Sequence, residues 1–334
     1  MSYLLRAPSN TPKDSIEISF SQDVRLNLYT DKSEPLTLLR PFLLDNKYLY
    51  GILRKKPHDQ LLCFDLDRQK FVSSISLTSD EVRDAGVNSF YVHSTDSIFF
   101  QTSNSAKIIL IDSLGKTLLI KEASPDHTFV FPSFMPEHRG YFDQPTNTYY
   151  STVVPVGYFN TFDERFDTYR FQGIFRMDKL VAPTRYAPLE GVMKQKVNSF
   201  YPPDLSVPYN LILGNKAFVT YPMDHYIYIY DLKTLELMDK RATSSSVKVD
   251  LLKPIPKELI DSRQEIWNFR ITSSFYEPLF YHPKVKLFTR AIHMQQDLKL
   301  ENGKLNTGKK RMTAVLILNE ELETVGQTIF NNGI

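Results

Sequence analysis

The most chemically suggestive stretch of this sequence is an aromatic and charged run near its middle. Residues 158–169 read Tyr-Phe-Asn-Thr-Phe-Asp-Glu-Arg-Phe-Asp-Thr-Tyr, so that rings and charges are mixed within one segment. Stacking faces with a few placed polar groups are what a sugar or peptide site needs. We therefore predict that Tyr158, Phe159 and Arg165 bind a ligand. An extended hairpin that packs on its neighbour is the alternative for the same run.

A second group of candidate residues combines aromatic rings with arginines, and consists of Tyr201, Trp267, Arg270 and Arg290. Tryptophan and arginine are frequent at binding hot spots, and the arginine fork suits carboxylates. We expect these four residues to bind the same ligand as the run at 158–169. For Trp267 and the two arginines, packing between neighbouring sheets with buried, hydrogen-bonded guanidinium groups is the alternative.

A basic segment follows near the C-terminus, with Lys304, Lys309, Lys310 and Arg311. Such a segment is usually a solvated connector, and an anionic partner is the alternative.

The sequence contains none of the common catalytic or nucleotide-binding motifs, such as G-x-S-x-G, H-E-x-x-H, G-x-x-x-x-G-K-[ST] or G-x-G-x-x-G. The 7 histidines are scattered, and neither His225 nor His282 has a second ligand at metal spacing. A single cysteine, Cys63, excludes an internal disulfide and a cysteine-based zinc site. We therefore predict no catalytic residue, no metal site and no cofactor.

Composition narrows the possible partners. The 40 basic and 38 acidic residues leave a net charge of +2, without the basic excess that a nucleic-acid-binding protein shows. No apolar stretch reaches the ~18 residues that a transmembrane helix requires, so we expect no transmembrane segment. The 23 Phe and 19 Tyr residues among 334 favour pleated, half-buried strands.

The elements that must position these residues repeat along the chain. Four short apolar runs separated by polar turns recur in five units, at residues 37–77, 88–122, 139–188, 209–242 and 277–330. Irregular repeats of short strands are typical of a β-propeller, in which each unit is one four-stranded antiparallel blade. We predict an all-β, monomeric propeller over residues 15–334, after a disordered tail at 1–14. Five full units with an N-terminal strand pair favour a six-bladed ring with one partial or truncated blade; a five-bladed ring is the alternative.

The connections between the predicted strands are unequal. The turns between first and second strands are short, whereas long connections occur at 154–169, 190–207, 244–266 and 293–311. In antiparallel blades every second connection lies at the same end, so the long loops should frame one binding face. Short helical turns are expected within 193–196 and 256–264. The predicted core consists of seven strand residues: Phe99, Ile109, Ile111, Ile227, Ile229, Leu316 and Leu318.

The C-terminal third carries a family resemblance, through Trp-Asn-Phe-Arg-Ile-Thr at 267–272, Glu-Pro-Leu-Phe-Tyr-His-Pro at 277–283, Leu-Phe-Thr-Arg at 287–290, Ala-Val-Leu-Ile-Leu-Asn-Glu-Glu-Leu at 314–322 and Val-Gly at 325–326. It resembles Bacteroidetes propeller lipoproteins classed only as a domain of unknown function, which look related to six-bladed, TolB-like propellers. Members usually begin with a lipoprotein signal and its cysteine, which this sequence lacks, and continue into another blade past a position like Gly326. The resemblance implies a cell-envelope location, either periplasmic or lipid-anchored with the signal removed, and no known catalytic residue. Without it, a cytoplasmic location is expected.

The sequence therefore predicts a non-enzymatic propeller that binds a small molecule, glycan, peptide or protein at its long-loop face. The alternative is a propeller enzyme, a lyase or hydrolase, whose site is assembled across blades at the channel mouth. An Asp or Glu side chain paired with a His or Arg at that mouth would favour the enzyme.

Overall fold

A computed structural model describes residues 3–5, 18–20, 39–45, 47–53, 58–78, 87–102, 106–124, 126–132, 140–156, 169–179, 183–190, 199–245, 254–259, 261–300, 302–306 and 311–331. The chain divides into two compact units, which are described separately. Unit 1 comprises Met1–Leu4, Ile18–Val156 and Gly173–Thr184. Unit 2 comprises Leu5–Glu17, Gly157–Gln172 and Arg185–Ile334.

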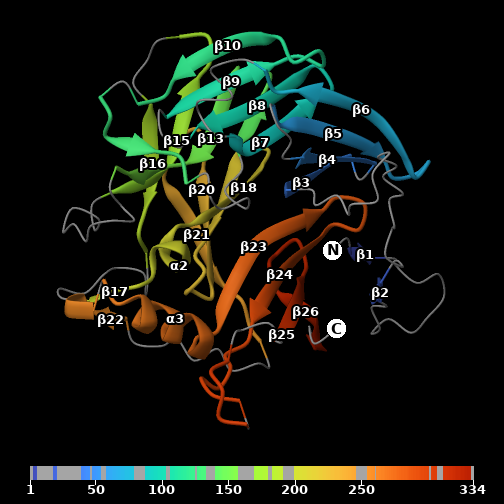
Figure 1. The fold of residues 1–334 in the computed structure, drawn as a ribbon. Helices are drawn as coiled ribbons and strands as arrows, with labels where there is room; N and C mark the ends of the chain where they lie inside the picture. Colours follow the sequence, from blue (N-terminus) through green and yellow to red (C-terminus); the bar gives the residue numbers. More distant parts are fainter. Residues whose placement is uncertain are drawn as a thin grey trace. The chain divides into compact units, whose positions relative to one another are not determined.

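Unit 1 contains two complete four-stranded antiparallel sheets (Figure 1). The first blade is formed by β3 (Leu39–Leu44), β4 (Tyr48–Leu53), β5 (Gln60–Asp65) and β6 (Lys70–Ser76). The second is formed by β7 (Val87–Ser94), β8 (Ser97–Thr102), β9 (Lys107–Ile111) and β10 (Thr117–Glu122). In each blade the strands pair in chain order, as alternating strand and short turn dictate.

The third blade also pairs its strands in chain order. It is formed by β12 (Tyr141–Asp143), β13 (Thr148–Thr152), β15 (Arg170–Arg176) and β16 (Thr184–Pro188). The boundary between the two units falls within β15 and β16.

Unit 2 contains the fourth and fifth blades, again antiparallel. The fourth is formed by β18 (Tyr209–Leu213), β19 (Lys216–Thr220), β20 (Tyr226–Asp231) and β21 (Leu237–Ala242). The fifth is formed by β23 (Phe275–His282), β24 (Leu287–His293), β25 (Met312–Leu318) and β26 (Thr324–Asn331).

The shorter strands and the helices are not part of the four-stranded blades. Three two-stranded ladders pair β1 (Tyr3–Leu5) with β2 (Ile18–Phe20), β11 (Phe129–Val130) with β14 (Val154–Pro155), and β17 (Ser199–Phe200) with β22 (Ile255–Pro256). Within the described ranges the helical elements are α2 (Pro203–Ser206), the 3₁₀ turn η3 (Lys257–Leu259) and α3 (Arg263–Thr272). The helix predicted within 256–264 therefore corresponds to η3 and the start of α3, and α3 continues eight residues further. The segment at 193–196 lies outside the described residues.

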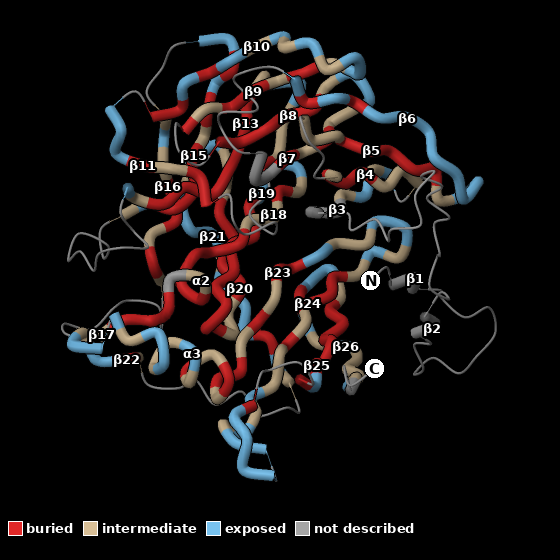
Figure 2. Tube along the Cα trace, viewed as in Figure 1, coloured by how far each residue is buried: buried red, intermediate tan, exposed pale blue. Residues whose placement is uncertain are grey.

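The core lies in the middle strands of the blades, where both sheet faces are covered (Figure 2). All seven residues predicted for the core are buried, from Ile109, Ile227, Leu316 and Leu318 at 0% exposure to Ile229 at 9%. Cys63 on β5 is also buried, at 4% exposure. Two of the fourth strands are different: β6 and β21 are largely exposed, because a blade's last strand is an edge. These sheets confirm the predicted all-β propeller of four-stranded antiparallel blades, and five such blades lie in the described part of the chain.

Candidate binding site in the second unit

The helix α3 fills the connection between the fourth and fifth blades, and its start is set by the sequence. The hydroxyl of Ser262 accepts a hydrogen bond from the amide of Glu265 at 3.3 Å. A serine followed three residues later by glutamate is a capping pattern, which satisfies amides that the first helical turn leaves unpaired. This pattern was readable in the sequence and marks where the helix begins.

The end of α3 is held by Arg311. This arginine is the last residue of the long connection between β24 and β25 of the fifth blade. Its guanidinium donates hydrogen bonds to the carbonyls of Arg270, of Ile271 at 3.1 Å and of Ser273 at 3.3 Å. Its carbon Cζ also lies 4.9 Å from the centre of the Phe275 ring. Cations at a helix C-terminus satisfy its carbonyls and complement its dipole. Arg311 therefore acts as a buried cap; burial lowers its pKa.

Two of the predicted binding residues lie on α3, which is thus fixed at both ends. Trp267 is 41% exposed, although tryptophan is a large apolar residue. Arg270, three residues later and so on a neighbouring part of the helix surface, donates from Nη2 to Asp204 Oδ1 at 2.7 Å. The side chains of this ion pair remain 39% and 27% exposed. The ring of Trp267 and the charge of Arg270 are therefore both accessible to solvent on α3.

Tyr201 lies beneath this helix. Its ring packs edge-on against Phe269 of α3, with 6.1 Å between ring centres, and the residue is buried. Burial raises the pKa of its hydroxyl, and the Asp224 carboxylate adds to that effect. Tyr201 supports α3 from below, and its phenol remains neutral at physiological pH.

Arg290 on β24 lies deeper, with 0% exposure. Its Nη2 donates to the carbonyl of Tyr221 at 3.0 Å and to that of Asp224 at 2.8 Å. Its guanidinium stacks on Tyr276, with Cζ 4.0 Å from the ring centre. Burial lowers its pKa to about 10, so it is still a cation at neutral pH. These contacts agree with the alternative given for Arg290 in the sequence analysis, which was a buried, hydrogen-bonded guanidinium that packs between neighbouring sheets.

The turn that Arg290 contacts, residues 221–225, joins β19 to β20 and is stabilised by a buried carboxylate. Asp224 is 0% exposed and accepts from the Tyr226 amide at 3.1 Å and from the Tyr228 hydroxyl at 2.7 Å. Burial raises the pKa of Tyr228 well above its usual value, and its hydrogen bond to Asp224 raises it further. Both carboxylate oxygens are therefore engaged within the turn.

These segments meet at one end of unit 2. The Tyr276 amide donates to the Pro222 carbonyl at 2.7 Å, and the Gln296 amide donates to the Ile271 carbonyl at 3.0 Å. The 221–225 turn, α3 and the start of the 294–311 connection are thereby tied together, and the Asp204–Arg270 pair adds α2. Parts of three predicted long connections, 190–207, 244–266 and 293–311, therefore contribute to this end.

A carboxylate–histidine pair lies on the fifth blade. His293 donates from Nε2 to Glu277 Oε1 at 2.7 Å, and its Nδ1 lies 3.1 Å from Thr313 Oγ1. The histidine ring also packs against Phe275, with 4.9 Å between ring centres. His293 and Thr313 are direct cross-strand partners, so the strand register brings them together.

Several predicted residues have no described position. Tyr158, Phe159 and Arg165 lie outside the described residues, as do Lys309 and Lys310. At the end of the aromatic run, Tyr169 packs edge-on against Phe171, with ring centres 5.1 Å apart, and lies under the guanidinium of Arg185. The connection predicted to begin at 154 starts instead with β14. Within the basic segment, Lys304 is exposed, whereas Arg311 is the buried cap of α3.

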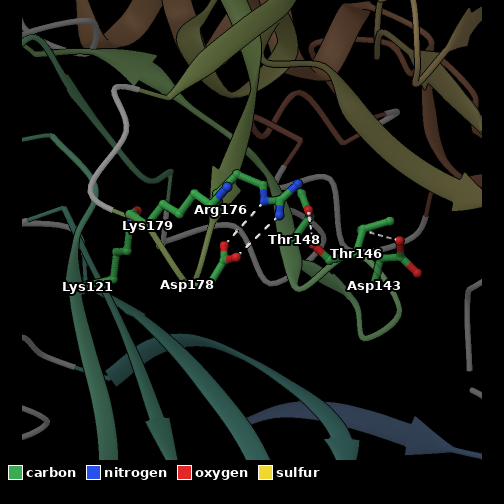
Figure 3. A network of polar contacts seen from close by, with 7 residues as sticks. All are labelled: Lys121, Asp143, Thr146, Thr148, Arg176, Asp178 and Lys179. Atoms are coloured by element: carbon green, nitrogen blue, oxygen red, sulfur yellow. Dashed lines mark hydrogen bonds and ion pairs between the residues drawn. The ribbon is translucent and has the colours of Figure 1, made fainter.

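At the short-turn end of the third blade, most of the polar contacts join residues close in sequence, unlike those around α3 (Figure 3). Arg176 and Asp178 pair at 3.3 Å, Thr146 donates to Asp143, and Thr148 donates to the Thr146 carbonyl at 3.0 Å. Lys121 donates to the carbonyl of Lys179. Apart from this last contact, each joins residues two or three positions apart and closes a turn. The short-range contacts stabilise the turns of this blade.

The described residues form neither a metal-binding cluster nor a membrane-spanning helix. Among those that the structure describes, no three His, Cys, Asp or Glu side chains are grouped closely enough to hold a metal ion. No helix within the described ranges is both long and apolar enough to cross a membrane.

Comparison with solved structures supports the fold. The chain is similar to a member of the DUF4221 family from Bacteroides vulgatus, with 14% identity, coverage of 89% of this chain and 81% of that one, and a TM-score of 0.60. It is more distantly similar to hydrazine synthase of Kuenenia stuttgartiensis (10% identity, 91% and 69% coverage, TM-score 0.40). The periplasmic gluconolactonase of Pseudomonas aeruginosa is at a comparable distance (9%, 95% and 92%, TM-score 0.39).

No family model and no curated protein matches the chain. At these identities the similarity extends to the fold alone. The first of the three structures supports the β-propeller class, whereas the two enzymes are too distant to bear on chemistry.

Proposed function

We propose that this protein is a non-enzymatic β-propeller binding module, and that its ligand or protein partner binds at the α3 end of unit 2. The face is defined by Trp267 and Arg270 of α3 with Asp204 of α2. Tyr158, Phe159 and Arg165 complete it in this proposal, because they belong to another of the long connections. Tyr201 supports the face, and Arg290 lies in the interior behind it.

The observation that carries the proposal is an exposed tryptophan on a helix whose two ends are fixed. Side chains that bind partners gain affinity when they are held in place before binding, since less conformational entropy is then lost. Ser262 and Arg311 hold the helix, and Asp204 holds Arg270 in one orientation. An aromatic ring next to an oriented cation suits a polar ligand with an apolar face, such as a glycan or peptide.

Trp267 also provides the test, because it is the only tryptophan of the chain. Its fluorescence reports on this face, so oligosaccharides, short peptides and dicarboxylates can be titrated directly. A ligand that binds here should give a saturable change in emission. Arg270→Gln should weaken binding of that ligand at least tenfold, since it removes the charge and the forked donor while it leaves a polar side chain.

Arg241→Gln is the matched control, because Arg241 makes a 2.7 Å pair with Asp239 on the exposed strand β21. It should leave affinity unchanged. The proposal is wrong if a ligand detected by calorimetry changes neither the emission of Trp267 nor its affinity in Arg270→Gln.

We further infer that the protein belongs with the TolB-like lipoprotein propellers of the bacterial cell envelope, and that residues 15–334 act as one propeller domain. The resemblance of residues 267–327 and the DUF4221 neighbour support this assignment. Fractionation of the native cells, with detection of the protein in membrane, periplasmic and cytoplasmic fractions, tests the location.

A second candidate function, hydrolysis, is favoured by the Glu277–His293–Thr313 arrangement. A carboxylate that orients a histidine, which in turn contacts a hydroxyl, is the geometry of an activated nucleophile. Turnover of ester and lactone substrates that disappears in both His293→Ala and Glu277→Gln would support hydrolysis. Absence of turnover in the wild-type protein would leave the three residues as a cross-strand contact.

A further inference from the structure

Two buried side chains of unit 2, Arg290 and Thr220, are among those with polar atoms that have no hydrogen-bond partner in the described residues. Arg290 uses only Nη2, and its Nε and Nη1 have no acceptor. The hydroxyl of Thr220, a residue that is 1% exposed, likewise has no partner. Buried polar groups in folded proteins are nearly always satisfied, so each exception calls for an explanation.

The strand register places these two side chains on facing surfaces. Side chains alternate along a strand, so Thr220 lies on the same face of β19 as Phe218, and Arg290 lies on the same face of β24 as Phe288. Phe218 and Phe288 pack together across the interface, with 5.4 Å between ring centres. The carbonyl next to Thr220, that of Tyr221, accepts from Arg290 at 3.0 Å. Thr220 and Arg290 therefore line the same end of the layer between the fourth and fifth blades.

The unsatisfied donors of Arg290 favour an acceptor that carries negative charge. Arg290 carries the positive charge, and its bonded partners are main-chain carbonyls, which are neutral. The nearest carboxylate in that turn, Asp224, already accepts from Tyr226 and Tyr228. Asp224 balances part of the charge of Arg290, since its carboxylate raises the pKa of the guanidinium, but it supplies no acceptor to Nε or Nη1. The stacking of Tyr276 supplies none either.

The groups left over can all donate: they are two guanidinium nitrogens and one hydroxyl, which can also accept. We propose that this interior site binds a small monovalent anion, either a halide such as chloride or a carboxylate group, held by Arg290 and Thr220. The persistence of the arginine's charge is consistent with its pKa of about 10, which lies well above neutrality. The site is distinct from the α3 face and does not depend on the proposed function.

The proposal is tested with bromide, acetate and gluconate at constant ionic strength. Thermal unfolding should move to higher temperature with increasing bromide or acetate, because a ligand that binds only the folded state stabilises it. Gluconate, which is too large for a buried site, should have no such effect. Crystals grown with bromide should show an anomalous peak within hydrogen-bonding distance of Arg290. A larger effect of acetate than of bromide would identify the carboxylate as the preferred anion.

Thr220→Val keeps the shape and removes the hydroxyl, so the variant should fold and bind bromide at least threefold more weakly. Arg290→Met should abolish the anion-specific shift. Thr289→Val is the control, because Thr289 precedes Arg290 on β24, faces the other side of the sheet and contacts His282. It should bind like the wild-type protein. Equal unfolding temperatures in all three salts, together with no anomalous peak at Arg290, would overturn the proposal.

Discussion

Replacement of Arg311 by methionine should destabilise unit 2 by loosening the end of α3. The guanidinium donates hydrogen bonds to three carbonyls. In the variant, the carbonyl of Ile271 still accepts from the Gln296 amide at 3.0 Å. The carbonyls of Arg270 and Ser273 lose a charged donor. A buried carbonyl left without a partner costs roughly 1–3 kcal/mol, and part of this is regained because burial of the cation is itself unfavourable. We expect a net loss of roughly 2–4 kcal/mol in the free energy of unfolding.

Urea denaturation measures this loss, and Trp267 reports where it occurs. If α3 frays, acrylamide should quench Trp267 more strongly in Arg311→Met than in the wild-type protein before global unfolding begins. Lys304→Met is the control, since Lys304 is an exposed cation of the same connection and should change stability by less than about 0.5 kcal/mol. Equal stability of Arg311→Met and Lys304→Met would refute the role of Arg311 as a cap.

Three further predictions concern the core, one turn and alkaline pH. Leu316→Ala, at a position with 0% exposure, should lower the free energy of unfolding by about 2–5 kcal/mol in the same denaturation assay, and a loss below about 1 kcal/mol would contradict the packing. Gly115→Ala should cost more than Gly214→Ala, because both have positive φ (+80° and +57°) but only at Gly115 would the new Cβ lie 2.8 Å from Ile75 and 3.2 Å from the Ser76 carbonyl. Equal losses in the two variants would show that the contact relaxes. Burial raises the pKa of Tyr91 from 10.0 to about 12, so its contribution to stability is complete below pH 10 and is lost as the pH rises towards 12. Urea midpoints measured between pH 9 and 12 should therefore fall less steeply in Tyr91→Phe than in the wild-type protein, and parallel curves would contradict this.

The blades were predictable because each strand carries its own pattern. The unit predicted at 209–242 coincides with β18 to β21, and the unit predicted at 277–330 differs from β23 to β26 by two residues at its start and one at its end. Alternating apolar residues fix which face of a strand is buried, and a slip by one residue would expose the whole set. Ile227 and Leu316 are buried for this reason.

The α3 end was less predictable, because its contacts join distant parts of the chain. Arg311 follows Lys309 and Lys310, and a basic run of this kind usually indicates an exposed connector. Only the return of the chain to α3 makes Arg311 a cap. The pairing of Arg270 with Asp204 spans 66 residues and has no local signature. By contrast, the serine–glutamate spacing at 262 and 265 is a local pattern that predicts where α3 begins.

The two residue types that occur once in the chain lie in different units: Cys63 is buried on β5 of unit 1, and Trp267 is on α3 of unit 2. A thiol reagent can react with Cys63 only when the first blade opens, so its labelling rate reports the opening free energy of unit 1. Tryptophan emission reports the loss of structure around α3 in unit 2. The wild-type protein therefore contains a separate probe for each unit, and no cysteine or tryptophan needs to be added by mutation. Coincident denaturation curves from the two probes would indicate one cooperative folding unit, whereas separated curves would reveal two.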